Sequence, residues 1–97
     1  MLKIIKDSAF ENLNLKSIKI PKNVSIIEDN AFIDCIDLDS VEFDNESELH
    51  SIGCYSFCNT SISTILIPYK VEEIKMCAFA KCENLKKVSN SIKVYKC

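Results

Sequence analysis

Six cysteines in a chain of 97 residues are the side chains best suited to chemistry. They are Cys35, Cys54, Cys58, Cys77, Cys82 and Cys97. Thiols can form disulfides, bind zinc or take part in redox exchange, and each role requires sulfur atoms at defined distances. Which role applies depends on the elements that hold the cysteines.

The spacing of these cysteines does not match a zinc site. Cys54-x₃-Cys58 and Cys77-x₄-Cys82 lack the paired spacing of zinc knuckles, and His50 is the only histidine. Acid-base catalysis would require a nucleophile or carboxylate fixed beside His50, and no such constellation recurs or clusters in the sequence. We therefore predict no catalytic residues, no metal and no cofactor. A cysteine-based redox or metal-binding protein is the alternative, which thiol titration and metal analysis would reveal.

The elements that carry these residues repeat about every 23 residues. The clearest markers are Phe10, Phe32, Phe57 and Phe79, each preceded by Ala or Ser and, five residues earlier, by Ile. Such a period marks a solenoid, in which neighbouring coils cover each other's apolar faces. The chain is predicted to be one domain, 1–97. Its repeats are expected at about 2–23, 24–48, 49–70 and 71–93, with a fifth starting at 94–97.

Each repeat contains one segment with the alternation of a β-strand. These segments follow the Phe and end in Ile18-Lys19-Ile20, Val41-Glu42-Phe43, Ile65-Leu66-Ile67 and Val88-Ser89. Stacked in parallel, they should form one buried ladder through Ile18, Val41, Ile65 and Val88 and a second through Ile20, Phe43 and Ile67. The short Ala-Phe segments should form irregular or 3₁₀ turns. The acidic segment 44–48 is expected to be a solvated loop.

This register also places the cysteines. Cys35 and Cys82 occupy one landmark two coils apart, about 10 Å, which is too far for a disulfide. They should be small buried hydrophobes. Cys54 and Cys77 lie in adjacent coils and could come within bridging distance, so their state stays open, but we expect free thiols to predominate. His50 is expected at the surface.

The solvent-facing side of the strands is the predicted binding surface for a protein partner. Its candidate residues, called the strand face below, are Lys16, Lys19, Asp39, Glu42, Ser63, Leu66, Lys86 and Lys87. Lys16 should lie beside Asp39 and Lys19 beside Glu42, which supports strand pairing by up to about 1 kcal/mol each. The simplest alternative is that these pairs serve the sheet alone.

Charge and composition exclude several other functions. A net charge of −2, with no continuous basic stripe and no interleaved aromatic platform, argues against nucleic-acid binding. No segment has the apolar length for membrane insertion or a signal peptide. The single glycine argues against a hairpin-rich barrel, whose tight turns need positive φ.

Several segments resemble the leucine-rich repeats of the BspA-like class, found in surface proteins of bacteria and of parasitic protists. They include Ile18-Lys19-Ile20-Pro21, Ala31-Phe32-Ile33-Asp34-Cys35 and Ala78-Phe79-Ala80-Lys81-Cys82. Leu13 and Thr60 replace the Cys in the other two repeats. The resemblance implies an α/β leucine-rich-repeat solenoid of about four coils, and a non-enzymatic interaction or adhesion module at the cell surface or secreted.

An intracellular scaffold with the same fold is the alternative, and it would be cytoplasmic. The absence of a signal segment favours this alternative, whereas the family resemblance favours the surface. Polar terminal caps, which solenoids normally need, are missing at both ends. We therefore expect either a fragment of a longer array or end-to-end self-association.

Overall fold

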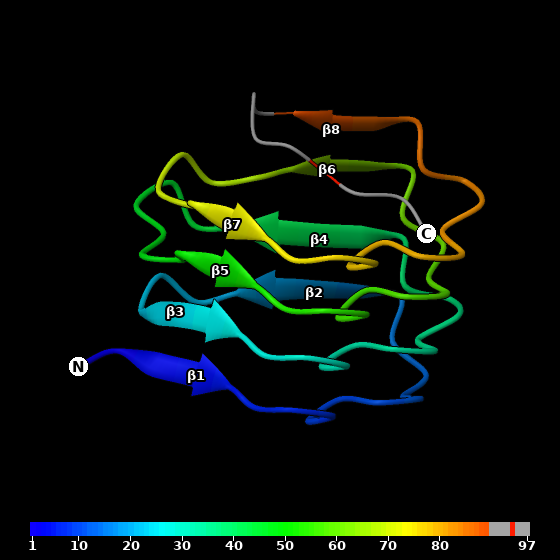
Figure 1. Cartoon of the computed structure of the whole chain (residues 1–97), viewed down its shortest axis with the longest axis horizontal. Helices are drawn as coiled ribbons and strands as arrows, with labels where there is room; N and C mark the ends of the chain where they lie inside the picture. The colour runs from blue at the N-terminus through cyan, green and yellow to red at the C-terminus, as the bar shows by residue number, and fades with distance from the viewer. Residues whose placement is uncertain (90–93, 95–97) are drawn as a thin grey trace.

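The chain winds into a rising stack of coils with short parallel strands on two sides (Figure 1). A computed structural model describes residues 1–89 and 94, and this part of the chain contains no helix. The strands are β1 (Lys3–Ile5), β2 (Ser17–Ile20), β3 (Val24–Ile27), β4 (Ser40–Phe43), β5 (Ser51–Ile52), β6 (Thr64–Leu66), β7 (Glu73–Ile74) and β8 (Lys87–Ser89). The predicted solenoid of about four coils is confirmed. Most of the expected fifth opening, 95–97, lies outside the described residues.

The odd-numbered strands form one continuous parallel sheet in the order β1-β3-β5-β7. Their core-facing Ile residues align from coil to coil, with Ile5 opposite Ile27, Ile27 opposite Ile52, and Ile52 opposite Ile74. These segments contain the Ile five residues before each Phe, at the start of each repeat, which the sequence analysis used as markers but did not predict to be strands. The solenoid thus has a second wall of strands that the sequence did not predict.

The even-numbered strands follow the predicted register but form two separate pairs. In β2–β4, Ile18 lies opposite Val41, and in β6–β8, Ile65 lies opposite Val88. No ladder of hydrogen bonds joins β4 to β6 among the described residues. The predicted ladders are therefore interrupted there, next to the loop 44–48 that lengthens the second repeat.

The four repeated phenylalanines stack in a single file through the interior, as predicted. The centroid distances are 5.1 Å for Phe10–Phe32, 5.2 Å for Phe32–Phe57 and 5.6 Å for Phe57–Phe79, and the rings are within 8° of parallel. Phe32 and Phe57 are fully buried. The file joins all four coils in one core.

Each coil turns around its Phe through two residues with left-handed backbone, at the positions two before and two after the ring. They are Ser8, Asn12, Asn30, Asp34, Tyr55, Asn59, Cys77 and Lys81, with φ between 57° and 63°. Asn and Asp tolerate this conformation best among non-glycine residues. The argument from the single glycine assumed that positive φ would be rare in this chain. That assumption is wrong, because these non-glycine residues adopt positive φ.

Lys81 occupies one of these left-handed positions, although lysine does not favour this backbone conformation. Lys81→Asn should therefore stabilise the fold by about 0.5 to 1 kcal/mol. Urea unfolding followed by circular dichroism measures the change. Lys75→Asn is the matched control, because Lys75 is also exposed but has ordinary backbone. Equal effects of the two substitutions would contradict the prediction.

Ser56 departs from the repeat pattern at the residue before Phe. The other coils have alanine at this place, as Ala9, Ala31 and Ala78. Its side chain is fully buried and its Oγ has no hydrogen-bond partner. A buried hydroxyl without a partner carries a desolvation penalty, so Ser56→Ala should raise the free energy of unfolding by about 1 kcal/mol.

Ser47 provides the control for this substitution, since it is also buried but its Oγ accepts a 3.2 Å hydrogen bond from the Leu49 amide. Ser47→Ala should therefore destabilise the protein. The prediction fails if urea titrations show the two serine variants shifting stability in the same direction.

Candidate partner-binding strand face

The even-numbered strands and the residues just before them carry the strand face. Lys19, Glu42, Leu66 and Lys87 lie within strands β2, β4, β6 and β8, respectively. The residues Lys16, Asp39, Ser63 and Lys86 precede the same strands. All eight side chains are exposed, while Ile20, Val41 and Ile65 on these strands point into the core. The structure thus places the predicted residues along one side of the stack.

The predicted charge pairs are neighbours, but they are not ion pairs. Lys19 lies opposite Glu42 in the β2–β4 register, and the Asp39 amide donates to the Lys16 carbonyl at 3.0 Å. Within residues 1–89 and 94, the ion pair closer than 4 Å is Lys70–Glu48, away from this face. The charged groups of the strand face therefore form no salt bridges with one another in this part of the chain.

A groove runs across the strand face where β4 and β6 separate. It has a volume of about 260 Å³, and its lining includes Glu42, Phe43 and Asp44 on one side and Leu66 and Pro68 on the other. At the start of the strands the coils remain in contact, since the Ser61 amide donates to the Leu38 carbonyl at 2.9 Å. Sequence reasoning identified Glu42 and Leu66 but missed the groove, whose only signal was the extra length of the loop 44–48.

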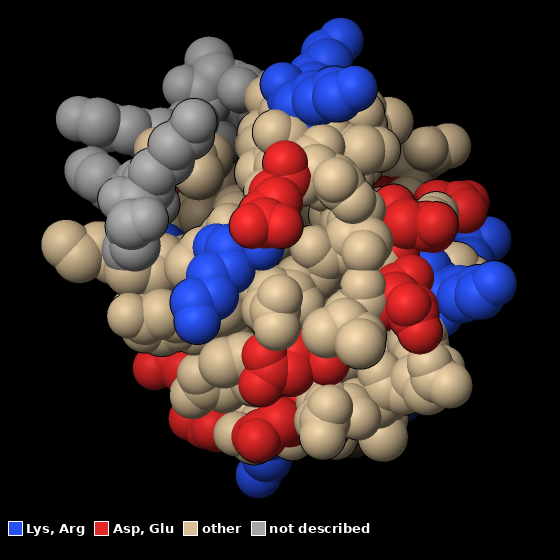
Figure 2. Space-filling model, turned by 90° about the vertical axis from the view of Figure 1, so that its right-hand side faces the viewer, with Lys and Arg blue, Asp and Glu red and all other residues tan. Residues whose placement is uncertain are grey.

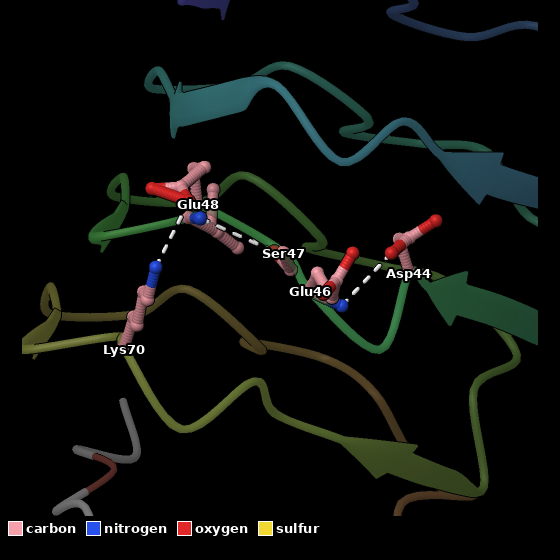
Figure 3. A network of polar contacts seen from close by, with 6 residues as sticks. Asp44, Glu46, Ser47, Glu48 and Lys70 are labelled. Carbon is pink, nitrogen blue, oxygen red and sulfur yellow. Dashed lines mark hydrogen bonds and ion pairs between the residues drawn. The ribbon is translucent and has the colours of Figure 1, made fainter.

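That loop is more ordered than the predicted solvated loop (Figure 3). Asp44 Oδ1 accepts a 2.8 Å hydrogen bond from the Glu46 amide, and Ser47 is buried, although Asn45 and Glu46 are exposed. Lys70 Nζ lies 2.9 Å from Glu48 Oε1, and this hydrogen bond lowers the pKa of the Glu48 carboxyl. The loop is a fixed corner between two coils.

Cysteines three positions after Phe have a structural role. Cys35 Sγ donates to the Phe10 carbonyl at 3.1 Å, and Cys82 Sγ donates to the Phe57 carbonyl at 3.0 Å, each reaching the preceding coil. Thr60 takes the same place in the third coil, and its Oγ1 donates to the Phe57 carbonyl at 3.0 Å. These thiols satisfy partly buried carbonyls rather than forming a reactive cluster.

The cysteines of the described residues include free thiols and a disulfide-bonded one. Cys35, Cys54, Cys58 and Cys82 are free, in line with the expectation that free thiols predominate, whereas Cys77, whose state the sequence left open, is disulfide-bonded. Cys54 is not its partner. Burial raises the pKa of the Cys35 and Cys58 thiols, which disfavours the reactive thiolate. No cluster of three metal-ligating side chains occurs in the described part of the chain.

The other sequence-based expectations concern surface charge and the single histidine. His50 is exposed, as predicted. On the side of the molecule shown in Figure 2, acidic and basic side chains are interspersed rather than gathered into a field of one sign. No helix in the described residues is long and apolar enough to cross a membrane.

Three solved structures share this architecture. A leucine-rich cell surface protein from Faecalibacterium prausnitzii is 30% identical with a TM-score of 0.71, over 76% of this chain and 19% of that one. A leucine-rich repeat protein from Bacteroides ovatus is 28% identical with a TM-score of 0.59, over 90% of this chain and 28% of that one. The T. pallidum leucine-rich repeat protein, 18% identical with a TM-score of 0.56, over 96% of this chain and 66% of that one, shares the fold.

The chain thus spans less than a third of the length of the first two proteins. A comparison with curated proteins gives no match. A family model described as the BspA-type leucine-rich repeat region, with six copies, matches residues 3–96. That match covers nearly every coil described above, and the chain therefore belongs to the BspA-type leucine-rich repeat family.

Proposed function

We propose that this chain is a non-enzymatic protein-recognition or adhesion module that works at a cell surface and binds its partner through the strand face. The observation that carries the proposal is the row of exposed charged and apolar side chains on short strands fixed by the core. Side chains held on regular elements can present a preformed surface to a partner, because little conformational entropy is lost on binding.

The comparisons support the setting of this proposal. The F. prausnitzii protein is described as a cell surface protein, and 76% of this chain aligns with it. The raised pKa values of the Cys35 and Cys58 thiols weigh against the redox alternative. Localising the full-length product in its own cells separates a surface module from an intracellular scaffold.

A charge-conserving triple variant tests the binding surface. The variant Lys19→Glu, Glu42→Lys, Leu66→Ser alters the strand face without changing the net charge. The control Lys75→Glu, Glu72→Lys, Met76→Ser makes the same kinds of change at exposed positions just before and after β7. All three proteins are used as bait for affinity capture followed by quantitative mass spectrometry.

We expect specific proteins to be recovered by the wild type and by the control but lost with the strand-face variant. Circular dichroism confirms that both variants are folded. Equal recovery by all three proteins would refute the strand face as the binding surface.

A further inference from the structure

The groove between β4 and β6 combines acidic and apolar surface. One side carries the carboxylates of Glu42 and Asp44, and the other carries Leu66 and Pro68. Phe43 also contributes to the lining. The groove exists because β4 and β6 are not hydrogen-bonded to each other, which leaves room beside the end of β4.

No ion pair within the described residues engages the acidic side of this groove, although Lys19 lies opposite Glu42 on β2. Glu42 is exposed, and no ion pair or hydrogen bond engages its carboxylate. Asp44 uses Oδ1 to accept the Glu46 amide and forms no ion pair. Two carboxylates near one groove favour a cation there, because like charges gain most from an opposite charge between them.

Two other grooves of the molecule differ from this one, because hydrogen bonds engage their acids or lysines line them. In the groove lined by Asp7, Glu28 and Asp29, Glu28 Oε1 accepts the Asp7 amide and Asp29 Oδ1 accepts the Cys54 amide. In the groove at the corner of the coils, Glu48 is paired with Lys70. These carboxylates serve the fold, whereas Glu42 does not.

The apolar side fits the stem of a long side chain. Leu66 is 65% exposed although its neighbour Ile65 is buried, so it offers apolar surface to a ligand at the groove edge. Arginine combines an aliphatic stem, which can cover Leu66, with a planar guanidinium that pairs with carboxylates and stacks on aromatic rings. Its cation is also less strongly hydrated than the ammonium of lysine, so it loses less on leaving water.

We propose that this groove binds an arginine side chain of the protein partner, with the guanidinium at Glu42 and the stem against Leu66. The inference rests on the proposed function and names the chemistry of the partner: an extended segment in which an arginine follows or precedes apolar residues. Asp44 adds to the negative potential beside Glu42.

The probe for this proposal is n-butylguanidinium, which carries the arginine stem and head without a peptide. Titrating it into ¹⁵N-labelled protein should shift the amide signals of Glu42, Phe43 and Leu66 before those of other exposed residues. Butyrate, with the opposite charge on the same stem, should not shift them. Glu42→Gln should raise the dissociation constant about fivefold, the upper range for an exposed ion pair.

Glu72→Gln is the matched control, since Glu72 is an exposed acid distant from the groove and its loss should leave the titration unchanged. Leu66→Ser should weaken binding of n-butylguanidinium while leaving the protein folded. Signals that shift equally at all exposed carboxylates, or a dissociation constant unaffected by Glu42→Gln, would overturn the arginine site. The proposed function would survive that result, because it fails only if the strand-face triple variant captures the same proteins as the wild type.

Discussion

Replacing Phe57 by alanine is expected to lower the free energy of unfolding by about 3 to 5 kcal/mol, as deletion of a large buried aromatic side chain does. Phe57 is fully buried and stacks on two rings, Phe32 at 5.2 Å and Phe79 at 5.6 Å. Its loss leaves a cavity in the middle of the file and removes contacts with both neighbouring coils. For a domain of this size that is a large share of the total stability.

Phe10→Ala is the internal reference for this experiment. Phe10 is only partly buried and stacks on a single ring, Phe32, because it lies in the first coil. Its replacement should cost roughly half as much, since the aromatic contacts and the buried area lost are smaller. Urea unfolding of both variants gives the comparison, and equal costs would show that the file does not act as a continuous core.

A single methyl group at Gly53 is expected to destabilise the protein by about 2 to 3 kcal/mol, the upper range for overpacking. A Cβ there would lie 2.6 Å from the Asp29 amide nitrogen, 2.6 Å from Asp29 Oδ1 and 2.7 Å from the Glu28 carbonyl carbon. Two of these three atoms are backbone, so rotating the Asp29 side chain cannot relieve the clash. The Gly53 amide is also fixed, by a 2.8 Å hydrogen bond to the Ile27 carbonyl.

Thermal and urea unfolding of Gly53→Ala measure this cost. Lys75→Ala is the appropriate comparison, because Lys75 holds the same coil position one repeat later, is exposed, and should change stability by less than about 0.5 kcal/mol. Adding Asp29→Ala to Gly53→Ala should not restore stability. If it does, the side chain of Asp29 rather than the backbone sets the requirement for glycine.

The sequence was sufficient to predict the elements that repeat by residue type. The Phe file, the register of Ile18 with Val41 and of Ile65 with Val88, and the exposure of His50 all follow from the period. In these cases the same kind of side chain recurs at the same place. Repetition then reveals both the coil and the face that is buried.

Features that depend on backbone geometry could not be predicted in this way. The left-handed positions carry Ser, Asn, Asp, Tyr, Cys and Lys, so no residue type marks them. The strands β5 and β7 are two residues long, too short to show alternation. The separation of β4 from β6 depends on how the loop 44–48 folds, and the hydrogen bond from Cys35 to the Phe10 carbonyl joins different coils.

The unequal walls of the solenoid have a mechanical consequence. The wall formed by β1, β3, β5 and β7 is hydrogen-bonded throughout, whereas the opposite wall has a seam between its second and third coils. Bending that opens the seam breaks no strand ladder, while bending that opens the continuous wall must break one. An array containing this module should therefore change its curvature most easily at the seam, where the two halves of the strand face meet.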